Sequence, residues 1–228
     1  MTLVWSPETA SKAYLDTIQT CEISSKTSAA EFLAAMAGGY NAKLIVETWK
    51  KDANGEANIT TSIGLAIAAN HTHGRHVCVV RDEASRVEYV SAMQKLSRDV
   101  SLPEVMVGEV EKIIRSKLSR VDFLVVDGWT KDFTRAFNSV KLNQHGAILV
   151  CKNESKGNNI SSTKFSWKGV LDAKVCVIIR AVTVPVGNGL EIAYIASNDG
   201  NLKYSTKNPN RWISHVDRGS GEEHVFRR

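Results

Sequence analysis

The chain has 228 residues, 43% hydrophobic and 23% charged, which is enough for one large buried core and excludes a fibrous or wholly disordered protein. The formal charge of +5 favours contact with anions, but Lys and Arg alternate with Asp and Glu, without the basic block typical of nucleic-acid binders. The sequence has no signal-peptide pattern, no apolar run near the ~20 residues that span a bilayer, and no C-x-x-C pair among its four cysteines. We therefore expect no membrane segment and a reducing compartment, the cytoplasm or the nucleus.

Two helices are predicted first, in a segment (residues 1–40) that packs on the main domain. Ser6 and Pro7 suit the start of a helix, and four apolar residues then fall on one helical face: Ala10, Ala13, Tyr14 and Ile18. A capping box, Ser28 with Glu31, starts the second helix, which Gly38-Gly39 ends.

Short apolar runs then alternate with helical patterns through a predicted domain at residues 41–197. The expected strands are Ala42–Glu47, His76–Val80, Glu104–Val107, Val121–Val126 and Ala147–Cys151. The helices between and after them are Ile59–Asn70, Glu83–Leu96, Glu109–Leu118 and Lys131–Val140. Strands separated by helices indicate parallel pairing with helices on both faces of the sheet. Two further runs, Lys174–Val184 and Leu190–Ser197, flank a turn (residues 185–189) and predict an antiparallel hairpin, followed by a polar, mobile tail at 198–228.

This order of elements resembles class I methyltransferases, whereas dinucleotide-binding dehydrogenases lack the final hairpin. The whole chain resembles a plant-specific domain-of-unknown-function family, which is similar in turn to S-adenosylmethionine-dependent O-methyltransferases over about residues 28–197. The resemblance implies a doubly wound, mostly parallel, Rossmann-like α/β sheet with a C-terminal antiparallel hairpin, preceded by two helices. It also implies S-adenosylmethionine as cofactor.

Ligands of open α/β sheets bind beyond the carboxyl ends of the strands, where the strand order reverses. After the first strand, Glu47 matches the acidic cofactor-binding position of the methyltransferases. The glycine-rich turn expected next is replaced by a segment that begins Thr48-Trp49-Lys50-Lys51. Thr61 and Ser62 then open a helix whose free N–H groups can bind a carboxylate or phosphate. The alternative is a capped helix with small residues that pack closely on the sheet.

Two further loops add candidates for cofactor binding. The second strand ends in Arg81-Asp82, where the cofactor's ribose hydroxyls require a carboxylate. Asp82 is a candidate for that contact, although its position also predicts the N-cap of the next helix. Glu109 follows the third strand and joins the same set.

The fourth strand, which ends at Asp127, gives the best match to the O-methyltransferases. In that family the matching Asp helps to bind a divalent metal together with an Asp-Asn pair after strand five. Here Lys152-Asn153 stands at that place, and because an ammonium opposes Mg²⁺ or Ca²⁺ binding, no metal is expected. Asp127 and Lys152 are the candidate catalytic residues: Lys152 can pair with Asp127 or act as a base if buried. An exposed lysine at a strand end is the favoured interpretation.

The segment between strands five and six, residues 153–171, is expected over the acceptor substrate. Its lysines and its aromatic residues, Phe165 and Trp167, can bind an acidic or aromatic ligand. The alternative is that the two rings only anchor a solvated loop. The histidines between His71 and His76 match no zinc spacing. No G-x-S-x-G elbow, P-loop or G-x-G-x-x-G motif is present.

Three functions follow from this pattern. The first is a divergent S-adenosylmethionine-dependent methyltransferase-like protein that acts on a small-molecule or other, unidentified acceptor. The second is a catalytically inactive methyltransferase fold kept as a binding or interaction module. The third, nucleic-acid binding, is supported only by the modest positive charge.

Overall fold

The computed structural model describes residues 5–21, 28–51, 55, 57–96, 100–127, 131–143, 145–153, 166–174, 176–197, 212–216 and 223–227. The chain forms two units, Met1–Asn198 and Asp199–Arg228. The helices are α1 (Pro7–Cys21), α2 (Ser28–Gly39), α3 (Thr60–Thr72), α4 (Glu83–Leu96), α5 (Val110–Lys117), α6 (Lys131–Ser139) and α7 (Trp167–Val170). The strands of the first unit are β1 (Leu44–Thr48), β2 (Arg75–Val80), β3 (Glu104–Val107), β4 (Phe123–Asp127), β5 (Ala147–Lys152), β6 (Cys176–Val184) and β7 (Leu190–Ser197).

These seven strands form one sheet in the order β3-β2-β1-β4-β5-β7-β6. Strands β1 to β5 pair in parallel, and β7 pairs antiparallel with both β5 and β6. The predicted fold class, a mostly parallel doubly wound sheet with a C-terminal antiparallel hairpin, is therefore confirmed. The order reverses between β1 and β4, so the carboxyl ends of these two strands mark the place where a ligand is expected.

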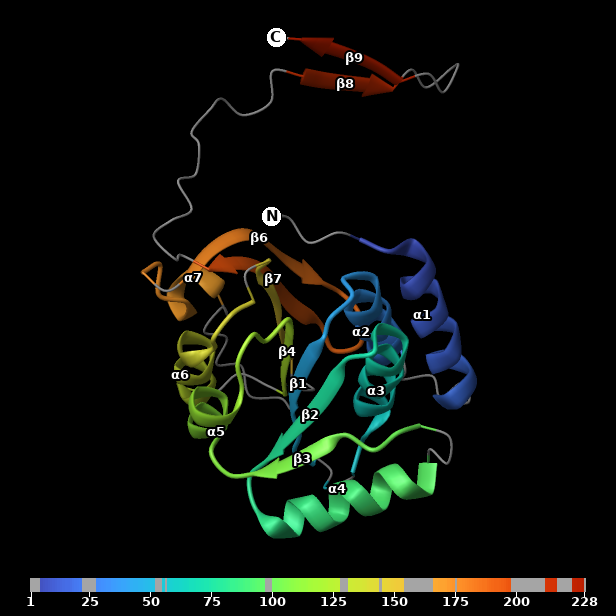
Figure 1. Cartoon of the computed structure of the whole chain (residues 1–228), viewed down its shortest axis with the longest axis vertical. Coiled ribbons are helices and arrows are strands. Elements are labelled where there is room, and N and C mark those ends of the chain that lie inside the picture. Colours follow the sequence, from blue (N-terminus) through green and yellow to red (C-terminus); the bar gives the residue numbers. More distant parts are fainter. Residues whose placement is uncertain are drawn as a thin grey trace. The chain divides into compact units, whose positions relative to one another are not determined.

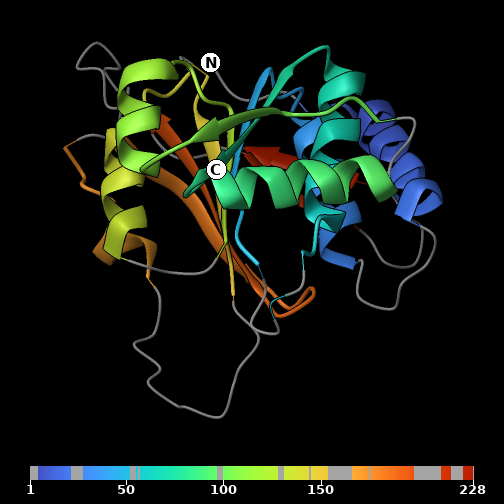
Figure 2. The same ribbon diagram turned by 90° about the horizontal axis from the view of Figure 1, so that it is seen from below.

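Helices cover both faces of this sheet (Figures 1 and 2). Buried side chains of α1, α2 and α3 share one hydrophobic cluster with β1, β4 and β5, and α4 extends this layer over β2. Side chains of α5, α6 and α7 form the cluster on the opposite face. The central strands are buried on both faces, which explains why their sequences are continuous apolar runs without alternation.

The first helix packs through part of the predicted face, with Thr17 in place of Tyr14. Ala10, Ala13 and Thr17 are buried, whereas Tyr14 is 43% exposed. Thr17 can be buried because its hydroxyl donates a hydrogen bond to the carbonyl of Ala13 at 2.7 Å. A polar residue with an internal partner thus replaces the larger apolar side chain that the helical pattern favoured.

A buried carboxylate, Asp122, joins strands at the amino end of the sheet. Its Oδ2 accepts hydrogen bonds from the backbone N–H groups of Lys43 (2.8 Å) and Leu44 (2.9 Å), and its Oδ1 accepts one from the side chain of Asn143 (2.6 Å). Asp122 therefore fixes the start of β1 beside β4, at the edge opposite the expected ligand site.

In the second unit, β8 (Trp212–Val216) and β9 (Glu223–Arg227) pair as antiparallel strands. The rest of the region predicted as a mobile tail lies outside the described residues. None of the helices described here is long and apolar enough to cross a membrane.

Candidate functional site

The carboxyl ends of β1 and β4 lie side by side and bring two candidate residues to one edge of the sheet. Glu47 is in register with Val125, two residues before Asp127. The backbone N–H of Asp127 donates a hydrogen bond to the hydroxyl of Thr48 at 3.0 Å. Glu47 and Asp127 thus lie at the same edge, as a shared crevice requires, although their side chains enter different surroundings.

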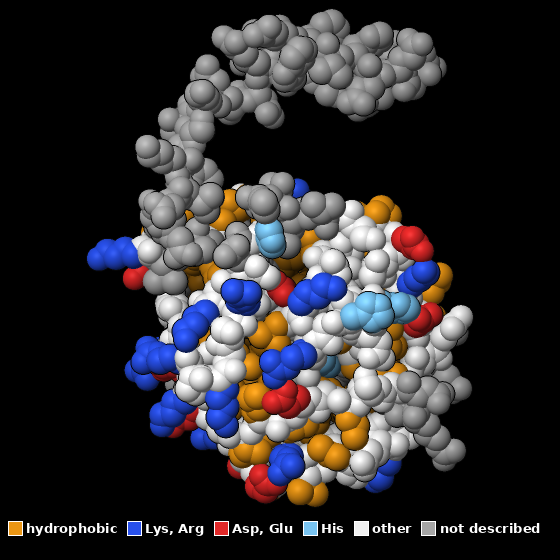
Figure 3. Space-filling view, viewed as in Figure 1, with side chains coloured by type: hydrophobic (Ala, Val, Ile, Leu, Met, Phe, Trp, Pro, Cys, Tyr) orange, Lys and Arg blue, Asp and Glu red, His pale blue; other side chains and the backbone are white. Residues whose placement is uncertain are grey.

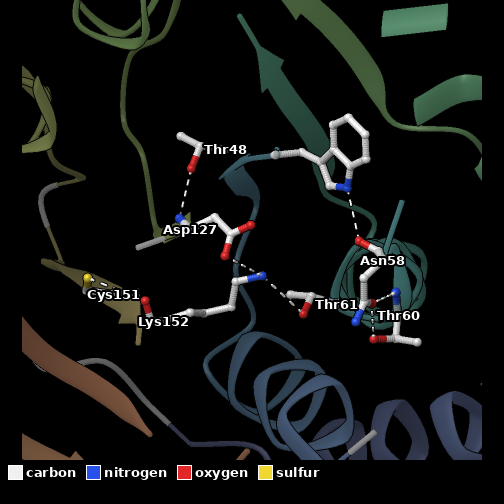
Figure 4. Close-up of polar contacts among 8 residues, drawn as sticks. Thr48, Asn58, Thr60, Thr61, Asp127, Cys151 and Lys152 are labelled. Atoms are coloured by element: carbon white, nitrogen blue, oxygen red, sulfur yellow. Dashed lines mark hydrogen bonds and ion pairs between the residues drawn. The ribbon is translucent and has the colours of Figure 1, made fainter. Parts of the chain in front are cut away.

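Asp127 and Lys152 form an ion pair at this edge (Figure 4). The two residues are direct neighbours in the parallel pairing of β4 with β5, and Lys152 Nζ lies 3.3 Å from Asp127 Oδ1. Lys152 Nζ also lies 3.5 Å from the hydroxyl of Thr61, in the first turn of α3. The Lys152 side chain is only 21% exposed. The favoured expectation of an exposed strand-end lysine is therefore wrong, because Asp127 and Thr61 hold the ammonium against the protein.

Glu47 points into the protein and is 2% exposed. Its Oε1 accepts a hydrogen bond from the hydroxyl of Tyr89 at 2.9 Å and lies 3.2 Å from His76 Nε2. Burial opposes ionisation of this carboxyl, but His76, a hydrogen bond from Ser62 and the charge of Lys152 outweigh it, so that the pKa of Glu47 lies below its ordinary value. With these partners Glu47 ties β1 to β2, α3 and α4, and its contact with a cofactor stays a prediction.

Trp49, the first residue after β1, packs against Tyr89, a partner of the Glu47 carboxylate. Trp49 is 5% exposed, meets the ring of Tyr89 edge to face at 5.3 Å, and donates an indole hydrogen bond to the carbonyl of Asn58 at 3.0 Å. The side chain of Asn58 in turn accepts hydrogen bonds from the backbone N–H and the hydroxyl of Thr60. Buried aromatic packing thus occupies the place where methyltransferases were expected to have a glycine-rich turn.

The two hydroxyl residues predicted to bind the cofactor, Thr61 and Ser62, lie in the first turn of α3 and are buried. Thr61 is 9% exposed and faces Lys152, and Ser62 is 1% exposed and bonds to Glu47. The helix approaches α2 closely, because a Cβ atom on Gly64 would lie 2.8 Å from the Ala30 carbonyl oxygen. Both interpretations of this segment, anion binding and close packing, therefore retain support.

The candidates after β2 and β3 lie on the surface. Asp82 Oδ1 accepts a hydrogen bond from the backbone N–H of Ser85 at 2.8 Å, which makes Asp82 a cap of α4 and lowers its pKa. Arg81 beside it is exposed. Glu109 is also exposed and pairs with Lys112 at 3.0 Å. The Ser85 side chain also hydrogen-bonds to the Asp82 carboxylate, and the ribose contact of Asp82 stays a prediction.

Of the segment expected over the acceptor, residues 153 and 166–171 belong to the described part of the chain. Trp167 is buried against Phe137, with the ring centres 5.2 Å apart, and starts the short helix α7. Of the two expected roles for this ring, the structure therefore supports the anchor. Phe165 lies outside the described residues.

Within the described ranges, no group of three or more His, Cys, Asp or Glu side chains could hold a metal ion. His71, in the histidine-rich segment, pairs with Asp16 at 2.7 Å. On the face seen in Figure 3, Lys and Arg lie among acidic and apolar side chains.

Sequence reasoning did not identify His76, Tyr89 and Thr48 as parts of this edge. One signal was available for His76: it lies two residues before Cys78 and four before Val80 in β2, so its side chain is on the same face of the sheet as theirs. Tyr89 carried no such signal, because its contact with Glu47 joins residues 42 positions apart.

The fold resembles those of solved methyltransferases. The SAH-bound methyltransferase PaMTH1 of Podospora anserina superposes with a TM-score of 0.53 at 14% identity, over 86% of this chain and 90% of that one. Cofactor-bound Rv0187 from MTB gives a TM-score of 0.52 at 18% identity, over 83% of this chain and 90% of that one. At such identities the likeness concerns the fold, which is methyltransferase-like. No curated protein matched the sequence. The model of the family "Protein of unknown function (DUF1442)" matches residues 1–228, and the chain therefore belongs to that family.

Proposed function

We propose that this protein binds S-adenosylmethionine at the carboxyl ends of β1 and β4 and transfers its methyl group to a small-molecule acceptor. The observation that carries the proposal is the cluster of Asp127, Lys152 and Thr61 at the point where the strand order reverses. Three elements of the fold supply these charged and polar groups to one spot, as a ligand site of an open α/β sheet requires.

The residues at this edge fit the charged groups of the cofactor. Thr61 and the first turn of α3 offer donors to the carboxylate of its methionine part, and Asp127 offers an acceptor to its ammonium group. The exposed carboxylate of Asp82 offers an acceptor to the ribose hydroxyls, and Glu109 follows the neighbouring strand. Glu47 and Ser62 would support the site indirectly, because the hydrogen bond between them holds β1 and α3 together. When bound, the cofactor supplies a methyl group activated by a sulfonium ion. A transfer of this kind depends mainly on positioning.

Thermal unfolding with S-adenosylmethionine and with S-adenosylhomocysteine tests the proposal. At a hundred times its Kd, either compound is expected to stabilise the fold by about 2.7 kcal/mol. Asp127→Asn is expected to weaken binding, because the amide can neither attract the ammonium group nor pair with Lys152. Glu104→Gln, at the amino end of β3, is the matched control and should bind normally. Absence of stabilisation by both compounds would reject the proposal.

One observation favours the second candidate function, an inactive fold that serves as a binding or interaction module. Trp49 fills the position of the expected glycine-rich turn, and the carboxylate of Glu47 is already bound by Tyr89 and His76. The same titration separates the two functions, since an inactive module need not bind either compound. The plant origin, inferred from the family resemblance, and the cytoplasmic or nuclear location, inferred from the pattern of cysteines and apolar runs, belong to this proposal.

A further inference from the structure

The ammonium of Lys152 is held at the site by two long polar contacts with described residues. An ammonium carries three protons, and within the described ranges its partners are Asp127 Oδ1 at 3.3 Å and Thr61 Oγ1 at 3.5 Å. Both distances exceed the roughly 2.7–2.9 Å of a close charge-assisted hydrogen bond. Figure 4 shows the lysine side chain extending from β5 so that its nitrogen lies between the two partners. A negatively charged ligand can therefore approach the ammonium without displacing a tight pair.

The surroundings of Lys152 make it the natural contact for an anion at this edge. Asp127 is 24% exposed and Glu47 is buried, and both carboxylates would repel an anion that came near them alone. Lys152 is 21% exposed, so part of its side chain remains open to solvent. Partial burial also strengthens its attraction for an anion relative to that of a fully solvated lysine.

We propose that Lys152 binds the reacting oxygen of the acceptor as an anion, either a carboxylate or an ionised phenol. This inference rests on the proposed methyl transfer and names the substrate class of the same site. The charge of the acceptor is the selective feature, because a neutral alcohol would gain little from the ammonium and would need a base to remove its proton.

The chemistry balances without a proton transfer. A lone pair of the anionic oxygen forms the new O–C bond to the methyl carbon, while the S–C bond breaks and its electron pair stays on sulfur. The products are a methyl ester or methyl ether and a neutral thioether. Lys152 keeps its proton throughout and is needed only to hold the anion. Because the methylated oxygen is no longer charged, its attraction to Lys152 falls and the product can leave.

Isothermal titration calorimetry with benzoate, 4-nitrophenolate and the neutral methyl benzoate tests this inference, with and without saturating S-adenosylhomocysteine. We expect at least one of the two anions to bind about tenfold more tightly than methyl benzoate, a difference of about 1.4 kcal/mol. The two anions then show whether the site prefers a carboxylate or a phenolate.

Variants at Lys152 assign the binding to its charge. Lys152→Met is expected to abolish the preference for the anion, and Lys152→Arg to retain most of it. Lys117→Met, which changes an exposed lysine at the end of α5, is the matched control and should behave like the unchanged protein. Circular dichroism of each variant verifies folding.

The two proposals fail in different ways. Failure of S-adenosylhomocysteine to bind would reject the proposed function, while the titrations without it still test the anion site. Equal binding of benzoate, 4-nitrophenolate and methyl benzoate, binding of neither anion, or an unchanged anion preference in folded Lys152→Met would overturn the assignment of Lys152.

Discussion

Replacing Glu47 by glutamine should destabilise the protein, because the carboxylate is 2% exposed and accepts hydrogen bonds from Tyr89 and Ser62. Glutamine has nearly the same shape and its carbonyl can still accept the hydrogen bond from Tyr89. That bond would fall from the roughly 1.5–3 kcal/mol typical of a charged acceptor to about 1 kcal/mol. The contact between Glu47 Oε1 and His76 Nε2 at 3.2 Å, which is an ion pair only when the imidazole is protonated, would also lose the carboxylate charge. Together these losses predict a decrease of about 2–3 kcal/mol in the free energy of unfolding near neutral pH.

The loss should depend on pH in a defined direction. The pKa of Glu47 lies below its ordinary value of 4.5, so its charge stabilises the folded state fully above that value. The stabilisation disappears as the pH falls through the lowered pKa of the folded state. The difference between the unchanged protein and Glu47→Gln should therefore shrink as the pH falls below 4.5.

Urea unfolding followed by far-ultraviolet circular dichroism, at several pH values, measures this difference. Glu104→Gln is the control, since its ion pair with Arg75 is exposed and its loss should change stability by no more than about 0.5 kcal/mol. If the two variants lose the same amount, or if the loss in Glu47→Gln does not shrink in acid, the reasoning about the buried carboxylate is wrong.

Three further predictions concern the packing and the cysteines. Gly64→Ala should lower the free energy of unfolding by about 1–3 kcal/mol, because its Cβ would lie 2.8 Å from a carbonyl oxygen of α2. Gly169→Ala, where the Cβ has open space, is the control and should lower it by less than about 0.5 kcal/mol in the same urea titration. Asp122→Ala should lower the free energy of unfolding, measured with urea, by about 3 kcal/mol, because three hydrogen-bond donors lose their acceptor. A decrease under about 1 kcal/mol would contradict the role of Asp122 in joining β1 to β4. Burial and the charge of Glu31 raise the pKa of Cys21 to about 11, so iodoacetamide should alkylate Cys21 slowly at neutral pH and faster in Glu31→Gln, as mass spectrometry of the native protein can show.

The sequence by itself determined the order and type of the elements in the first unit. Continuous apolar runs such as β1 and β4 indicated buried strands, and a capping pattern with glycines at the end bounded α2. These signals lie between residues that are neighbours along the chain, and so they can be read without the fold. Helix α7 was missed, because four residues carry too little periodicity to be recognised.

The tertiary structure alone decided what the candidate residues contact. The sequence placed Glu47, Asp127 and Lys152 at strand ends, but it could not show that Glu47 turns inward to Tyr89 and His76. Nor could it establish that Lys152 pairs with Asp127 beside Thr61, a residue 91 positions away. Periodicity determines which side of an element is buried, whereas the partner of a buried charge depends on which elements the sheet order makes neighbours. The pairing of β1 with β4, between which β2 and β3 intervene in the chain, and the pairing of β4 with β5 bring these charges together at one edge.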